Sequence, residues 1–171
     1  LNPIRHIDPI GLICMVLFGF GWAKPVPVNA YYFKNRKLSM SFTALAGPLT
    51  NIVFATLSLL FLNLLFLTPA SGNIAIDFLS LFSNFLYIFA LLNIGLAVFN
   101  LIPIPPLDGS KILAMFLSNE NHAKLMRFEQ FGFPVLIVLS LTGVLGRILS
   151  IFITPLFNAW FGLANWIISL F

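Results

Sequence analysis

Charged residues are scarce in this sequence. Nine Lys or Arg and five Asp or Glu make up 8% of the 171 residues, against roughly 25% in ordinary soluble domains. Hydrophobic residues make up 60%, so there is too little polar surface to cover a water-soluble globule. The composition therefore excludes a disordered chain, a secreted disulfide scaffold and an enzyme free in the cytosol. It predicts an integral membrane protein surrounded by the lipid bilayer.

Cysteine and histidine are scarce as well. The single cysteine, Cys14, cannot form an internal disulfide, and because it lies in an apolar run we expect it to be a small buried hydrophobe.

The net charge is +4, but no basic stretch is interleaved with aromatic residues on a polar segment, so we expect no nucleic-acid partner. The basic residues lie between apolar runs, as they do in cytoplasmic loops of membrane proteins.

Long apolar runs predict the membrane topology, because a crossing helix needs about 20 apolar residues. Residues 42–67, 74–102 and 131–153 are long enough, and 155–171 predicts either a fourth crossing or an interfacial helix. The run 9–23 is short and interrupted by glycines, which predicts a re-entrant or strand-like segment. We therefore expect an all-α polytopic membrane protein with three to four transmembrane helices in a single domain, residues 1–171.

The distribution of Lys and Arg predicts the orientation of these helices. Basic residues occur in 24–37 and 111–130 but not in 68–77. Cytoplasmic loops carry the excess of Lys and Arg, so residues 24–37 and 111–130 should face the cytoplasm. The segment that follows residue 102 then lies near the cytoplasmic side of the membrane.

The segment Asn100-Leu-Ile-Pro-Ile-Pro-Pro-Leu-Asp108-Gly109 is the most informative part of the sequence. Its prolines cannot continue a helix, and irregular backbone near membrane depth is tolerated only where protein buries it or where it lines a wet cavity. An acid in this setting is a candidate functional residue, and carboxylate oxygen is a zinc ligand. Asp108 is therefore a candidate metal ligand. The alternative is that it N-caps a helix over 110–117.

Three further groups of polar residues allow a functional and a structural interpretation. Asn51 follows Gly47-Pro48 on a crossing helix and can bind an extended substrate backbone or a neighbouring helix. Asn93 and Asn100 lie two turns apart, either lining a cavity or joining helices. His6 and Asp8 are only a weak candidate metal pair, and a hydrogen-bonded turn at the membrane edge is favoured for this segment.

Four segments, residues 6–11, 20–29, 46–51 and 100–109, resemble the site-2 protease family in sequence and order. These are zinc metalloproteases that cut peptide bonds inside membranes, and the resemblance is greatest to compact bacterial members without a PDZ domain. It implies a multi-pass protein of the bacterial plasma membrane, Zn²⁺ as cofactor, and transmembrane proteins or peptides as substrates. It implies that Asp108 is the third zinc ligand, that Asn51 helps to position substrate, and that Asn100 lies beside the metal loop.

The sequence departs from the family in one important respect. The family's other zinc ligands and its general-base Glu come from a His-Glu-x-x-His helix, whereas this chain has only His6 and His122, in no such motif. We expect a chain truncated just after that helix, which alone neither holds catalytic zinc nor cleaves peptides. The alternatives are an inactive membrane homologue that binds transmembrane clients and, less favoured, a transporter fragment, for which the sequence lacks a related second half.

Overall fold

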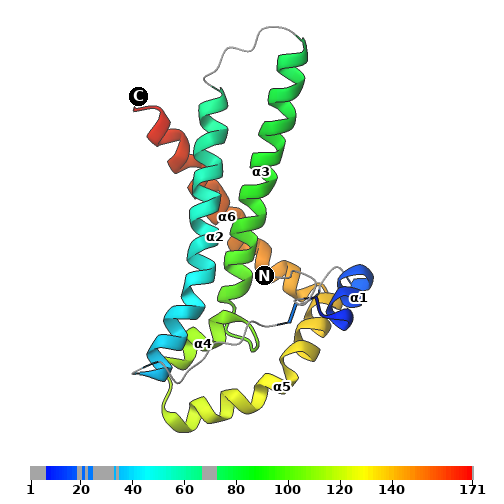
Figure 1. The fold of residues 1–171 in the computed structure, drawn as a ribbon, viewed down its shortest axis with the longest axis vertical. Helices are drawn as coiled ribbons and strands as arrows, with labels where there is room; N and C mark the ends of the chain where they lie inside the picture. The colour runs from blue at the N-terminus through cyan, green and yellow to red at the C-terminus, as the bar shows by residue number, and fades with distance from the viewer. Residues whose placement is uncertain are drawn as a thin grey trace.

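The computed structural model describes residues 7–18, 21, 23–24, 33, 35–66 and 73–170. Its elements in chain order are six helices: α1 (Pro9–Phe18), α2 (Arg36–Phe66), α3 (Asn73–Leu101), α4 (Asp108–Ala114), α5 (Asn119–Leu141) and α6 (Val144–Ile168). Within these ranges the predicted all-α architecture is confirmed. Figure 1 shows α2 and α3 side by side along their lengths, α6 crossing them obliquely, α4 and α5 at the lower end, and α1 to the right beside α5.

Small and branched apolar side chains hold α2, α3 and α6 together. Ala55 and Leu59 of α2 pack with Ala90 of α3 and Phe157 of α6, and all four are buried. Small residues let membrane helices approach closely, which is the main source of packing energy where lipid offers no hydrophobic driving force. A polar contact adds to this packing, because the Trp160 indole N–H donates to Thr56 Oγ1 at 2.6 Å.

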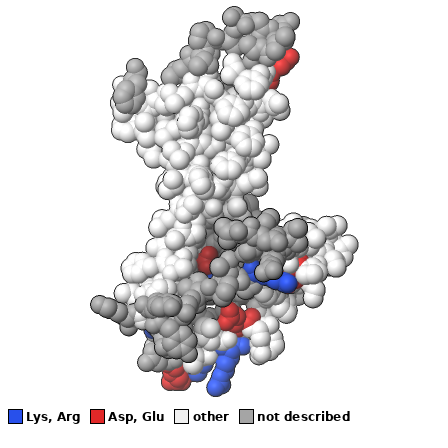
Figure 2. Space-filling model, viewed as in Figure 1, with Lys and Arg blue, Asp and Glu red and all other residues white. Residues whose placement is uncertain are grey.

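Three of the described helices are long and apolar enough to cross a membrane: Lys37–Leu65, Asp77–Leu101 and Val144–Ile168. Their outer surfaces expose large apolar side chains such as Val53, Ile88 and Phe152, which suits contact with lipid. Figure 2 shows that charged residues gather at the lower end of the molecule, around α4 and α5. The chain is an integral membrane protein, and the predicted crossings 42–67 and 74–102 correspond to α2 and α3.

The predicted boundaries of the third and fourth apolar segments are wrong. The expected crossing 131–153 is interrupted, because α5 ends at Leu141 and Gly143 adopts the left-handed conformation with φ 71° before α6 begins. The predicted separate segment 155–171 is instead mostly the continuation of α6, which passes through Pro155 without ending. Proline is tolerated inside membrane helices because neighbouring groups satisfy the backbone that it frees.

Residues 9–23 were expected to be re-entrant or strand-like, and the structure shows a ten-residue helix, α1. Ile7 and Ala23 form an isolated antiparallel bridge, so the flanks of this segment return to one another. Asp8 Oδ1 accepts hydrogen bonds from the backbone N–H groups of Ile10 at 3.0 Å and Gly11 at 2.9 Å. Asp8 therefore caps α1 in a hydrogen-bonded turn, while His6 lies outside the described residues.

The tight contact between α2, α3 and α6 predicts that enlarging Ala90 destabilises the protein. Ala90 is completely buried, and an Ala90→Leu side chain has no room there, so we expect a loss of about 1–3 kcal/mol in unfolding free energy. Ala159→Leu is the matched control, because Ala159 is exposed on α6. Circular dichroism during denaturant titration in detergent measures both. Equal stability of the two variants would contradict the packing described above.

Candidate functional site

The candidate site lies at the lower end of the molecule, where α3 gives way to irregular backbone. Prolines at 103, 105 and 106 follow Leu101 directly and prevent the helix from continuing. The chain then turns through backbone hydrogen bonds between residues that are close in the sequence, Ile104 N–H to Ile102 O at 2.8 Å and Leu107 N–H to Ile104 O at 3.0 Å. This turn brings the chain back against α2, where α4 begins at Asp108.

Polar side chains in the first turns of α2 hold the far end of α4. The Ser41 hydroxyl is buried and lies 2.6 Å from the carbonyl oxygen of Lys111 and 3.0 Å from that of Lys37. The Lys37 ammonium donates to the carbonyl oxygen of Leu117, just beyond α4. The last carbonyl groups of a helix find no N–H donor within that helix. The bonds from Ser41 and Lys37 therefore supply donors that α4 cannot supply itself.

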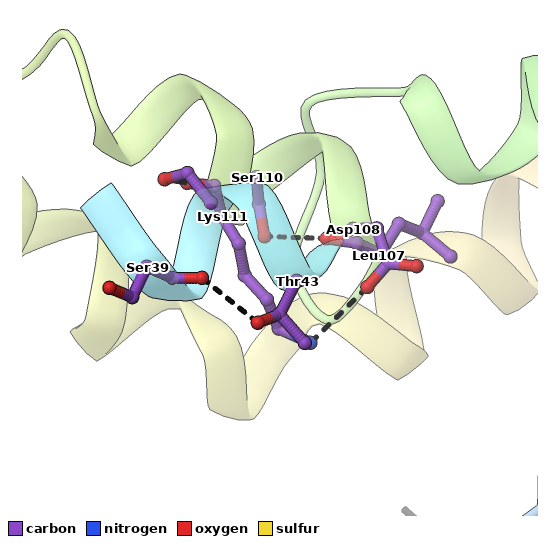
Figure 3. A network of polar contacts seen from close by, with 7 residues as sticks. Ser39, Thr43, Leu107, Asp108, Ser110 and Lys111 are labelled. Carbon is purple, nitrogen blue, oxygen red and sulfur yellow. Dashed lines mark hydrogen bonds and ion pairs between the residues drawn. The ribbon is translucent and has the colours of Figure 1, made fainter. Parts of the chain in front are cut away.

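The Asp108 carboxylate projects from the first residue of α4 towards α2. Its Oδ1 accepts from the Lys111 ammonium at 3.3 Å, and its Oδ2 lies 3.3 Å from where a Cβ on Gly47 would be. Figure 3 shows Asp108 and Lys111 facing one another beside Ser110. The alternative prediction that Asp108 N-caps a helix over 110–117 is wrong, because Leu107 holds the cap position without a side-chain bond.

The structure therefore brings together two of the segments singled out in the sequence, residues 46–51 and 100–109. Gly47 contacts the Asp108 carboxylate, and Asn51 lies one helical turn further along the same face of α2. Asn100, in the last turn of α3, and Asn51 are both partly buried, and no hydrogen bond from either amide to another described residue is found. Asn93 differs, because it is buried and donates to Phe89 O at 2.8 Å within its own helix.

The described residues do not by themselves form a zinc centre. A catalytic zinc takes three protein ligands and a water, and no group of three His, Cys, Asp or Glu is found in the part of the chain that the structure describes. The partly exposed Asp108 carboxylate fits one such ligand position. The predicted role of Asp108 thus depends on ligands that these residues do not supply.

Sequence reasoning missed the contribution of Ser41 and Lys37 to this site. The two residues lie four apart on α2 and so share one helix face. No other feature of the sequence distinguishes Ser41 from Ser39, whose side chain is on a different face. Only the position of α4 in space shows which serine matters.

Comparison with known proteins finds sequence similarity to metalloproteases. Residues 68–143 match the sequence profile of "Peptidase family M50". The chain is 40% identical, over 83% of its length, to "Putative zinc metalloprotease YwhC" of Bacillus subtilis and spans 64% of that protein. It is 32% identical, over 86% of its length, to "Putative zinc metalloprotease Rip2" of Mycolicibacterium smegmatis and spans 55% of it. No solved structure matches.

The matched residues include α3, the loop that contains Pro103, Pro105 and Pro106 (the proline loop), Asp108 and α5. Through these residues and these relatives the chain is similar to peptidase family M50, the site-2 protease family. It spans between about half and two thirds of the length of the relatives named above.

Removing the Ser41 hydroxyl should loosen α4. Ser41→Ala leaves the Lys111 carbonyl without its donor at a buried position, which costs about 1–3 kcal/mol, so we expect faster amide hydrogen exchange in α4. Thr43→Val is the control, since that hydroxyl is exposed and bonds only to Ser39 O of its own helix. Unchanged exchange in Ser41→Ala, or an equal change in both variants, would disprove this role.

Adding one methyl group at Gly109 should displace the proline loop, which connects α3 to α4. A Cβ at Gly109 would overlap the carbonyl oxygen of Leu101, so Gly109→Ala forces backbone to move and should destabilise the protein by about 1–3 kcal/mol. A Cβ at Gly146 meets open space, so Gly146→Ala should be neutral or slightly stabilising. Thermal unfolding in detergent compares the two, and a stable Gly109→Ala variant would refute the close approach.

Proposed function

We propose that this chain is part of a zinc-dependent intramembrane metalloprotease, in which Asp108 is one metal ligand and Asn51 and Asn100 contact the substrate. The observation that carries the proposal is the contact of the Asp108 carboxylate with Gly47. It joins two of the four segments that resemble the protease family, although they are far apart in the sequence. Relatives named as zinc metalloproteases support the same activity.

The local geometry supports a ligand role for Asp108. Its carboxylate starts a short helix, is partly exposed, and has one oxygen near Lys111 and the other near Gly47. A metal ligand must be held in place by its surroundings to give a defined geometry. Because Gly47 has no side chain, the second oxygen can approach the backbone of α2 without a clash.

The substrate role of α2 and α3 follows from the position of the two amides. Asn51 lies above Gly47 on α2, and Asn100 ends α3 immediately before the proline loop. Amide groups at these positions can hydrogen-bond the backbone of an extended peptide. The proposed substrates are therefore membrane-spanning proteins or peptides whose helix is opened near the site.

The remaining ligands and the general base must come from elsewhere in the protein. We assign them to a His-Glu-x-x-His helix outside residues 1–171, because His6 and His122 stand in no such motif. The 171 residues alone are therefore expected to bind no catalytic zinc and to cleave no peptide. The alternative, a catalytically inactive homologue, is one result that the experiment below can give.

Substitution of Asp108 in the full-length protein tests the proposal. Asp108→Asn and Asp108→Ala should lower zinc affinity and cleavage of a transmembrane peptide by more than about 100-fold, since the first replaces an anionic metal ligand with a neutral, weaker one and the second removes it. Asp77→Asn is the matched control, because Asp77 is exposed near the opposite end of α3. Elemental analysis for zinc and a cleavage assay measure both effects.

Two results would overturn this function. An Asp108→Ala protein that retains zinc and cleaves substrate would show that Asp108 is not a ligand. A wild-type full-length protein that binds no zinc and cleaves nothing would instead support an inactive homologue.

A further inference from the structure

A cavity of about 370 Å³ lies beside the candidate site, between α2, α4 and α5. Ser110 and Lys111, which follow the Asp108-Gly109 pair directly, contribute to its wall, and so does Pro105 from the proline loop. The cavity therefore adjoins α4 just after Asp108, which is not itself one of its lining residues. None of the roles assigned above to Asp108, Asn51 or Asn100 uses it.

The cavity combines apolar walls with basic groups. Met40 of α2 and Met126 of α5 form part of the apolar surface, and methionine adapts to side chains of different shape. Lys37 and Lys111 also line it, together with His122 and a single acid, Glu129. Lys111 is already paired with the Asp108 carboxylate, whereas no ion pair of Lys37 is found among the described residues, so Lys37 offers the cavity a positive charge that no described carboxylate neutralises.

Both lysines have hydrogen-bonding capacity to spare. The Lys37 ammonium donates to Leu117 O and the Lys111 ammonium to Asp108 Oδ1. An ammonium group carries three donors, so each lysine can still bind a ligand while keeping its present hydrogen bond. The cavity thus suits a ligand that has an apolar group and ends in an anion.

We propose that this cavity binds a peptide C-terminus, with the carboxylate near Lys37 and Lys111 and an apolar terminal side chain against Met40 and Met126. The inference rests on the proposed function, because hydrolysis of a peptide bond beside Asp108 releases one new carboxylate and one new amine. The two lysines favour the fragment with the carboxylate. The adaptable methionines admit more than one apolar residue at its end.

Binding of synthetic peptides to the purified full-length protein in detergent tests this site. One fluorescent peptide ends in Leu with a free carboxylate, and a second has the same sequence with a C-terminal amide. We expect the free acid to bind at least tenfold more tightly by fluorescence anisotropy. Met126→Trp, which fills the cavity, should weaken binding of both peptides at least tenfold, and Lys111→Gln should abolish the difference between them.

Lys124→Gln is the matched control for charge. Lys124 lies on α5, pairs with Glu120 at 2.8 Å and is not among the residues that line the cavity. This variant should keep the preference for the free acid. Loss of the preference in Lys124→Gln to the same extent as in Lys111→Gln would show a non-specific charge effect and overturn the proposal.

Three further outcomes separate the possible failures. Equal binding of acid and amide by a protein that cleaves substrate would overturn the cavity proposal and leave the protease function intact. If laurate binds with a dependence on Met126 while the free-acid peptide does not bind, the cavity is a fatty-acid site and the proposal is wrong. Because binding is read without catalysis, preference for the acid in a protein that cleaves nothing would support the cavity and reject the protease function.

Discussion

The attachment of α4 to the first turns of α2 is the interaction on which the candidate site depends. A seven-residue helix is too short to be stable alone, so its position is set by the groups that hold it. Ser41 and Lys37 bind backbone carbonyls at its far end, and Gly109 packs against the end of α3 at its start. With both ends fixed, the Asp108 carboxylate is directed at Gly47. The ion pair with Lys111 is too exposed to do this by itself, since such pairs contribute at most about 1 kcal/mol.

The apolar frame and the polar site are separated along the helices. The packing of α2, α3 and α6 occupies the part suited to the bilayer, and the polar groups gather where the prolines end α3 (Figures 1 and 2). The same loop positions α5, because Gly132 approaches the Pro105 carbonyl so closely that a Cβ would overlap it. One irregular segment therefore positions both the proposed metal ligand on α4 and the α5 wall of the adjoining cavity.

The sequence predicted those features that follow from composition and from proline. The crossings α2 and α3 are uninterrupted apolar runs, and the end of α3 follows from prolines that exclude helix. The boundary between α5 and α6 was missed because the residues around Gly143 stay apolar, so hydropathy gives no sign of its left-handed turn, whereas Pro155 resembles a break and is not one. The contact of Asp108 with Gly47 was expected from neither residue. It follows from the attachment of α4 to α2, to which Ser41 contributes because its hydroxyl faces the Lys111 carbonyl, and nothing in the sequence marks Ser41 for this role.

Cross-linking in native membranes is the most direct test of this account. In a full-length protein without Cys14, Gly47→Cys and Asp108→Cys place two thiols at the contact described here, and a short bifunctional thiol reagent reports whether they meet. The account predicts an intramolecular cross-link for the 47/108 pair and none for a control pair of Gly47→Cys with Glu120→Cys, whose position is exposed at the start of α5. Absence of the 47/108 cross-link, with both cysteines shown to be reactive, would contradict the placement of Asp108 against α2.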